Sequence, residues 1–408
     1  MLDPARILLR CEALARHSEL AGGLTRVYLS DEQAAASELV LGWMREAGMD
    51  ARLDAIGNCV GRYEGVRPAL PCLMLGSHLD TVRDAGKYDG MLGVVAAIEC
   101  VQALHSAGKR LPFALEVIGF ADEEGVRFGT TLLGSRAVAG TFRTEALAAL
   151  DKDGIALAAA LRGRGLDPGR IAEAARGPGQ VLAYAELHIE QGPVLEAEGL
   201  PVGVVTAING ATRYALEIEG MAGHAGTVPM RLREDALAAA AECVLAVEAR
   251  CAREPDLVGT VGKLEALPGA VNVIPGKVRF TFDLRAPSNP QREAAVSDVL
   301  ADMTRACARR KVILHARKMH DEPVAACAPW LIEQIGAAIA AEGLAVRALP
   351  SGAGHDGMAM VELCDIGMLF VRCEKGISHN PRESITREDA ATGARVFLRF
   401  IENFQPPR

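Results

Sequence analysis

The chain has 408 residues, which is more than one ordinary hydrophobic core organises, so we expect two domains. Half of the residues are hydrophobic and 24% are charged, as is typical of a globular protein, and the formal net charge is −8. Nucleic-acid binding needs a basic face, so we predict no nucleic-acid partner. No run of about 18 uninterrupted apolar residues is present, and we therefore predict no membrane span.

The N-terminal segment and the cysteines both favour a reducing compartment. Charged residues are spread through the apolar positions of residues 1–20, which predicts an amphipathic helix and not a signal peptide. The ten cysteines include no C-x-x-C pair, and several lie in apolar runs, where a free thiol behaves as a small hydrophobe. We therefore predict reduced thiols and a cytoplasmic location.

The first half of the chain alternates between helical and strand-like patterns. The patterns predict helices at residues 31–48 and 93–107, and buried strands at residues 71–76 and 113–120. Ser30 is expected to be the N-cap of the first of these helices. Such alternation predicts an α/β fold with a mostly parallel sheet flanked by helices, in which the chemistry collects at the carboxyl ends of the strands.

Residues 209–322 follow a different pattern. A strand, a helix, two strands, a helix and a strand are expected in that order, which is the order of a ferredoxin-like α+β unit. The α/β character returns from about Pro323. The simplest arrangement is a catalytic domain formed by residues 1–208 and 323–408, interrupted by an inserted domain at residues 209–322.

The strongest functional signal is a set of possible metal ligands on turns that follow strands. They are His78, Asp80, Asp89, Glu123, Glu124, His188 and His379. Two neighbouring divalent cations of the zinc type take mixed imidazole and carboxylate ligands, and one carboxylate can bridge them. A pair of adjacent glutamates is usually solvated surface, but Glu123 and Glu124 follow an apolar strand, which is a poor setting for idle charge. We therefore predict a two-metal hydrolytic site in which a carboxylate outside the ligand set removes a proton from water.

These motifs resemble those of the amidase, hydantoinase and carbamoylase group of the aminoacylase-like metallopeptidase superfamily. The resemblance runs nearly from end to end, from the string at residues 77–81 (Ser-His-Leu-Asp-Thr) to the string at residues 379–381 (His-Asn-Pro). It implies two divalent ions per subunit, zinc or manganese. His78 and His188 would hold one ion, Glu124 and His379 the other, and Asp89 would bridge them.

The resemblance also implies roles for the neighbours of these ligands. Asp80 would orient His78, and Glu123 would be the acid/base. Family members carry a cis peptide after the bridging aspartate, here between Asp89 and Gly90. Peptidase relatives usually have an acidic residue at the position of His188, and the string at residues 188–192 (His-Ile-Glu-Gln-Gly) is similar to the branch that hydrolyses ureido groups.

Substrate-binding residues are implied in the same way. They are Gln191, His224, Asn272, Arg285, Gly354 and His355, and His224 would also steady the oxyanion. Taken alone, Asn272 would be an ordinary turn residue and Arg285 a surface charge. By the resemblance, Arg285 binds the substrate carboxylate, for which arginine offers a planar, two-pronged set of donors. The family's inserted domain serves as dimerisation and lid domain, which implies a homodimer in which His224 acts in its own or in the partner's site.

The function implied is hydrolysis of the terminal ureido (carbamoyl) C–N bond of a small ureido carboxylic acid, with release of ammonia and carbon dioxide. The strings at residues 223–230 and 368–373 are most similar to allantoate amidohydrolases, which favours allantoate and a role in purine catabolism. N-carbamoyl-L-amino-acid hydrolases and β-ureidopropionases share the same catalytic set and stay open as alternatives. Less favoured are a metal-dependent aminoacylase or peptidase, and a binding protein without activity.

Overall fold

The computed structural model describes residues 2–407, which form two compact units. The first unit consists of residues 2–206, Ala326–Leu349 and residues 353–407, and the second consists of Ala207–Ala325 and Pro350–Gly352. Among the described residues, no helix is both long and apolar enough to cross a membrane.

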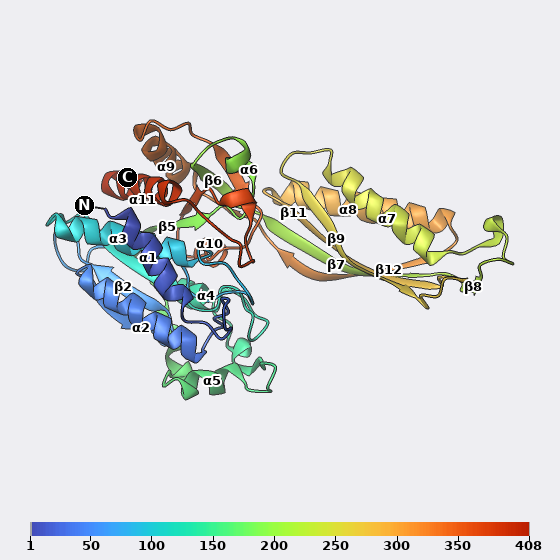
Figure 1. The fold of residues 1–408 in the computed structure, drawn as a ribbon, viewed down its shortest axis with the longest axis horizontal. Helices are drawn as coiled ribbons and strands as arrows, with labels where there is room; N and C mark the ends of the chain where they lie inside the picture. Colours follow the sequence, from blue (N-terminus) through green and yellow to red (C-terminus); the bar gives the residue numbers. More distant parts are fainter. Residues whose placement is uncertain (1, 408) are drawn as a thin grey trace. The chain divides into compact units, whose positions relative to one another are not determined.

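The first unit is built on a nine-stranded sheet (Figure 1). Its strands are β1 (Asp50–Leu53), β2 (Cys59–Tyr63), β3 (Cys72–His78), β4 (Ala114–Phe120), β5 (Val181–Ile189), β6 (Val202–Ile208), β13 (Ala325–Ala326), β14 (Ala348–Ser351) and β15 (Ile366–Val371). They lie in the order β1-β2-β4-β3-β5-β15-β6-β13, and β14 pairs with β6.

The fold class predicted from the sequence is confirmed, with one difference in the sheet. The four central strands β4, β3, β5 and β15 are parallel, but β1, β2 and β6 pair antiparallel with their neighbours. The sheet is therefore mixed, with a parallel centre. The short strand β1 exposes most of its side chains, so its sequence lacks the apolar pattern by which a strand can be predicted.

Five helices share one hydrophobic core with one face of this sheet (Figure 1). They are α1 (Pro4–Ala15), α2 (Asp31–Glu46), α3 (Met91–Ser106), α9 (Pro329–Ala341) and α11 (Arg387–Asn403). The predicted cap of α2 is confirmed, because the Gln33 N–H donates to Ser30 Oγ at 3.1 Å. Along β5, Ala185 and Leu187 belong to this core, so the alternating side chains of Glu186 and His188 point to the opposite face of the sheet.

The second unit is a four-stranded antiparallel sheet covered by two helices (Figure 1). Its elements in chain order are β7 (Gly210–Glu219), α7 (Ala236–Cys251), β9 (Val258–Leu267), β11 (Lys277–Ala286), α8 (Asn289–Arg309) and β12 (Ile313–Glu322). The strands lie in the order β12-β7-β11-β9. The predicted order of elements is therefore present, and their buried side chains form a core separate from that of the first unit.

Candidate active site

The carboxyl ends of the parallel strands bring the predicted ligands together in the first unit. His78 ends β3, His188 lies near the end of β5, and Glu123 and Glu124 follow β4. Asp89 lies in the loop before α3. The loop passes so close to His78 that a Cβ on Gly90 would lie 2.5 Å from the His78 ring, which only glycine avoids.

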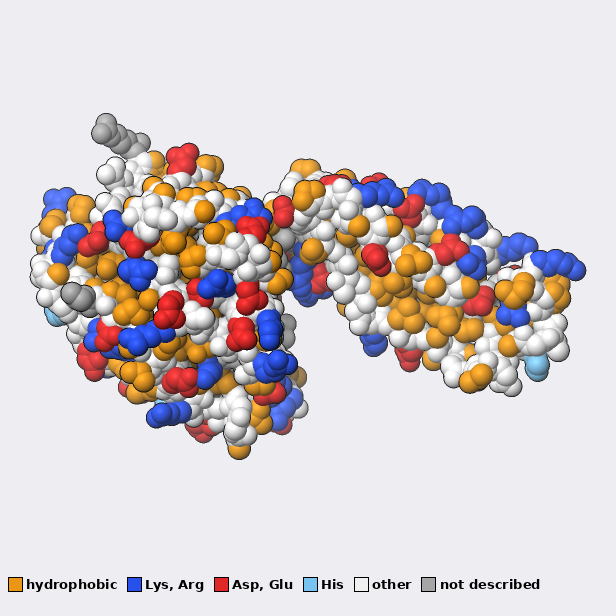
Figure 2. All heavy atoms as spheres, turned by 45° about the horizontal axis from the view of Figure 1, so that its top comes forward, with side chains coloured by type: hydrophobic (Ala, Val, Ile, Leu, Met, Phe, Trp, Pro, Cys, Tyr) orange, Lys and Arg blue, Asp and Glu red, His pale blue; other side chains and the backbone are white. Residues whose placement is uncertain are grey.

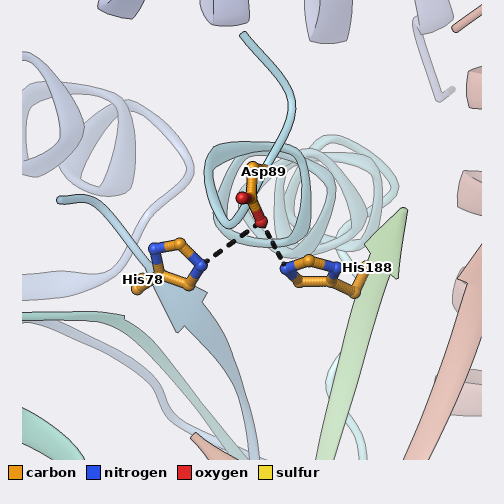
Figure 3. A group of neighbouring side chains, drawn as sticks. All are labelled: His78, Asp89 and His188. Carbon is orange, nitrogen blue, oxygen red and sulfur yellow. Dashed lines mark ion pairs between the residues drawn. The ribbon is translucent and has the colours of Figure 1, made fainter. Parts of the chain in front are cut away.

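Asp89 lies at the centre of this group, with imidazoles facing both of its carboxylate oxygens. His78 Nε2 and His188 Nε2 lie 3.6 and 3.1 Å from Asp89 Oδ1. Figure 3 shows both rings turned toward this carboxylate. His379 Nε2 lies 3.1 Å from Asp89 Oδ2 and 3.5 Å from Glu124 Oε1. Nitrogen and oxygen ligands that sit about 2.0–2.1 Å from a tetrahedral zinc-type ion are about 3.3 Å apart. These spacings therefore fit groups of side chains that could hold a metal ion, and Asp89 belongs to two such groups.

The hydrogen bonds of two histidines fix which ring nitrogen faces Asp89. His78 Nδ1 lies 3.0 Å from the Asp80 main-chain oxygen, and His188 Nδ1 lies 2.8 Å from that of Ile189. Because a carbonyl oxygen only accepts, each Nδ1 carries a hydrogen, and Nε2 is the nitrogen that faces Asp89 Oδ1. The Gly90 N–H donates to His188 Nε2 at 3.2 Å. Metal-binding histidines are commonly oriented in this way.

Asp80 contacts His78 and also the turn that carries the two glutamates. Its two carboxylate oxygens accept the main-chain N–H groups of Glu123 and Glu124 at 3.0 and 3.1 Å, while its Oδ1 is 3.9 Å from His78 Nδ1. Asp80 thus orients His78 through its main-chain carbonyl and holds the turn that carries both glutamates with its side chain.

Burial and crowding shift the protonation of the site. Burial raises the pKa of Glu123 well above its usual range, with Glu124 adding to the shift and His78 opposing it. Burial raises the pKa of Glu124 to about 7, against the influence of His78. Burial alone would also raise the pKa of Asp89, but its contacts with His188, His379 and His78 hold that pKa well below the usual range.

The carboxylates of this region outnumber its cationic groups. Buried carboxylates here include Asp80, Asp89, Asp122, Glu123, Glu186, Asp356 and Glu383. Burial tends to lower the pKa of His78, but Asp89 and Glu123 outweigh it and raise the pKa well above the usual value. The site therefore favours cations, whether protons or metal ions, on its imidazole nitrogens.

Three predicted substrate-binding residues belong to the second unit. His224 in β8 (Gly223–His224) and Asn272, just before β10 (Val273–Ile274), are both exposed. The Ala225 N–H donates to the main-chain oxygen of Asn272 at 3.0 Å. Arg285 lies near the far end of β11. At about 3.3 Å per residue, Lys277 and Arg285 are roughly 26 Å apart along this strand. The unit therefore carries His224 and Arg285 at opposite ends of its sheet.

Arg285 is already oriented by its own unit. Its Nε and Nη2 donate to the two oxygens of Asp283 at 3.0 and 3.1 Å, and its Nη1 donates to the Gly352 oxygen at 2.7 Å. A guanidinium has five N–H groups, so two remain for a further acceptor.

Comparison with known proteins places the chain in a family. The profile of peptidase family M20/M25/M40 matches residues 74–403. The chain belongs to this family. An N-carbamoyl-L-amino acid amidohydrolase of Geobacillus stearothermophilus is 44% identical over 381 residues, which are 93% of each chain. An allantoate deiminase of Arabidopsis thaliana is 39% identical over 98% of this chain and 83% of that protein.

A solved structure supports the same placement of this M20-family chain. An amidase of the hydantoinase/carbamoylase family from Burkholderia multivorans superposes with a TM-score of 0.92 at 32% identity, covering 98% of this chain and 97% of that one. The resemblance to the amidase, hydantoinase and carbamoylase group is therefore confirmed.

One expectation for the M20-family site is wrong. The peptide bond between Asp89 and Gly90, expected to be cis, is trans, and within residues 2–407 the cis bond found joins Leu267 to Pro268. A non-proline cis bond costs about 2.5–4 kcal/mol. The chain turns instead through Gly90, whose φ of 71° is open to glycine.

The remaining predicted residues of the first unit lie around the ligands. Gln191 Nε2 donates to Asp89 Oδ1 at 3.2 Å and lies 3.1 Å from Ser378 Oγ, so this side chain contacts the central carboxylate. The His355 ring is buried and packs edge-on against His188, with centroids 4.4 Å apart. A Cβ on Gly354 would lie 3.8 Å from Glu123 Oε1, which places this loop beside the expected acid/base.

The structure also brings in residues that the sequence did not single out. Glu186 lies with His188 and His355 in a buried group of possible ligands, and it accepts hydrogen bonds from Ser77 Oγ at 2.7 Å and from the Tyr184 hydroxyl at 2.9 Å. Glu383 contacts the loop of Asp89. The period-two pattern of β5 could have indicated that Glu186 shares a face with His188, but no sequence pattern marks Glu383.

Proposed function

We propose that this chain hydrolyses the terminal ureido C–N bond of a small ureido carboxylic acid. It is a hydrolase of the amidohydrolase and carbamoylase type. The observation that carries the proposal is the pair of ligand groups that share Asp89, in which His188 takes the place of the acidic residue usual in peptidase relatives. Allantoate is the first choice of substrate. An N-carbamoyl-L-amino acid is the second, because the relative named for that substrate is 44% identical.

The site fits two divalent ions, zinc or manganese. His78, Asp89 and His188 would hold one ion, and Asp89, Glu124 and His379 the other, since each trio has ligand atoms within 4.8 Å of one another. Such ions would polarise the ureido carbonyl and lower the pKa of water.

Glu123 is suited to move the proton. Its carboxylate is buried, and burial raises its pKa well above the usual range, so this carboxyl holds a proton more readily than an exposed glutamate does. Glu123 takes a proton from the attacking water and returns it to the departing nitrogen. The departing nitrogen leaves as ammonia, and the carbamate that stays on the substrate nitrogen then loses carbon dioxide to give the amine. The hydrogen bonds from the Glu123 and Glu124 N–H groups to Asp80 keep this turn in place.

The proposed substrate residues require two subunits. Arg285 would bind the substrate carboxylate with its two remaining N–H groups, and His224 would steady the oxyanion, with Asn272 beside it. Because roughly 26 Å of strand separates the two ends of the sheet, a single inserted unit cannot place both Arg285 and His224 on one small molecule. We therefore propose a homodimer in which the partner supplies His224.

The surface of the second unit is consistent with such a partner. Near His224, Met221, Met230 and Val271 are highly exposed, and Figure 2 shows hydrophobic side chains gathered on a face of this unit. Contiguous apolar patches are typical of protein–protein contacts. Gln191, Gly354 and His355, which lie around the expected metal ligands of the first unit, are the other proposed substrate-binding residues.

Ammonia release tests the proposal directly. The metal-free protein is loaded with Zn²⁺ or Mn²⁺ and assayed with allantoate, N-carbamoyl-L-amino acids, N-carbamoyl-β-alanine and a dipeptide side by side. Turnover of allantoate supports the first choice, and turnover of N-carbamoyl amino acids alone replaces it by the second. A dipeptide as the only substrate would overturn the ureido proposal. Glu123→Gln should lower kcat by about 10²–10⁴-fold with its metal content unchanged, and an unchanged kcat would exclude Glu123 as the acid/base.

A further inference from the structure

Glu383 joins two loops that both carry expected metal ligands. Its Oε1 accepts the main-chain N–H groups of Tyr88 and Asp89 at 2.8 and 3.1 Å, and its Oε2 accepts the Ser378 hydroxyl at 2.8 Å. Ser378 directly precedes His379. The carboxylate is 2% exposed, so water cannot replace it as an acceptor. Glu383 thus connects the loop of Asp89 to the loop of His379.

The loop of Asp89 packs directly on this side chain. A Cβ on Gly86 would lie 2.2 Å from Glu383 Cβ, so the chain at that position passes against Glu383 with room only for glycine. Ser378 Oγ also lies 3.4 Å from Asp89 Oδ2, which is the oxygen that faces His379. His379 itself has a φ of 53°, a value that non-glycine residues keep only where their surroundings hold them.

The two metal positions differ in how their ligands are fixed. His78 and His188 lie on strands β3 and β5, and main-chain carbonyls orient both rings. In contrast, His379 lies on a loop, and its side chain is 51% exposed. The position formed by Asp89, Glu124 and His379 therefore depends most on contacts between loops.

We propose that Glu383 is a positioning residue that fixes Asp89 relative to His379 and thereby sets the affinity of the divalent ion held by Asp89, Glu124 and His379. The inference rests on the proposed two-metal hydrolase. Glu383 touches neither the proposed ions nor the substrate. It acts through its hydrogen bonds with the main-chain N–H of Asp89 and with Ser378. Residues that hydrogen-bond to metal ligands or their loops commonly fix the ligands' orientation in this way.

Metal titration of the metal-free protein tests this proposal. The two stepwise constants for Zn²⁺ are measured by competition with a chromophoric chelator, and His379→Ala identifies the constant that belongs to the loop position. Glu383→Ala should weaken that same constant by about 10–100-fold and leave the other within about twofold. Glu383→Gln keeps an oxygen for the two N–H groups but loses the charge, so it should weaken the constant less. Ser378→Ala should also weaken it.

A matched control separates positioning from general loop support. Asp151 is also a buried carboxylate that accepts two main-chain N–H groups, from Asp153 and Ile155 at 3.0 and 2.9 Å, in a loop without expected ligands. Asp151→Asn should leave both constants unchanged. If the wild-type protein shows two binding constants and neither Glu383→Ala nor Glu383→Gln changes them, the positioning role of Glu383 is overturned and the proposed function stands. A wild-type protein that binds no divalent ion would overturn both. If Glu383→Ala does not fold, as judged by circular dichroism, Glu383→Gln and Ser378→Ala decide the outcome in the same way.

Discussion

Replacement of Asp80 by alanine should both destabilise the first unit and loosen the turn of the acid/base. The substitution leaves the N–H groups of Glu123 and Glu124 without their acceptor. A buried N–H group without a partner costs about 1–3 kcal/mol, so two cost about 2–6 kcal/mol. Burial raises the pKa of Asp80, which means that its ionised form is itself unfavourable there, so its removal offsets part of this cost. We therefore expect the lower half of that range.

Two measurements test the effect of Asp80→Ala, one on the stability of the first unit and one on the turn of Glu123 and Glu124. Urea denaturation of the metal-free protein, followed by a signal from the first unit, should show a lower urea midpoint for Asp80→Ala than for the wild type. Asp80→Asn keeps one acceptor oxygen and should lower the midpoint by about half as much. Hydrogen exchange read by mass spectrometry should show faster exchange in the peptide that contains Glu123 and Glu124. Asp167→Ala is the control. The Asp167 carboxylate accepts the Gly169 N–H at 2.9 Å, but this contact is exposed, so water can replace the carboxylate. Unchanged exchange in Asp80→Ala would refute the assigned hydrogen bonds.

Two further predictions concern metal loading and the substrate carboxylate. Burial raises the pKa of Glu124 to about 7, so this carboxyl keeps its proton below that pH and an incoming ion must displace it. Displacement of this one proton should make the apparent metal affinity rise by about tenfold per pH unit up to about pH 7. Calorimetry in two buffers of different ionisation enthalpy should detect the released proton. A metal affinity that is constant from pH 5.5 to 7 would contradict this prediction. Arg285→Gln should lower kcat/KM for ureido acids by about 10–100-fold, since hydrogen bonds to charged groups contribute about 1.5–3 kcal/mol. It should have little effect on the corresponding ureido amides, and an equal loss on both would exclude Arg285 as the carboxylate ligand.

The metal-ligand candidates could be predicted from the sequence because they follow local patterns. His78, Glu123 and His188 each lie at or just after the end of an apolar strand. Because β3, β4 and β5 are parallel neighbours, their carboxyl ends meet at one edge of the sheet. Period-two and period-3.6 patterns thus predicted both the α/β fold and the edge at which the side chains meet.

The partners of these residues could not be predicted, because they depend on contacts between distant parts of the chain. Glu383 lies in a polar stretch without periodicity, and the Tyr88 N–H that it accepts is 295 positions away. Asp80 illustrates a second limit. A sequence shows that an aspartate follows His78 at the right spacing, but it does not tell whether the side chain or the main-chain carbonyl reaches the ring. The edge strand β1 was missed because it is short and mostly exposed.

The cluster of buried carboxylates around the site affects how much folded protein a cell accumulates. Without cations these groups repel one another and resist ionisation, so the folded state gains stability from whatever cation it captures. An ion that is present at about 100 times its dissociation constant adds about 2.7 kcal/mol to the folded state, which is a large part of the stability of an ordinary domain. Cells grown in metal-depleted medium should therefore accumulate less of this chain, and addition of Zn²⁺ or Mn²⁺ during expression should raise the yield before any substrate is present.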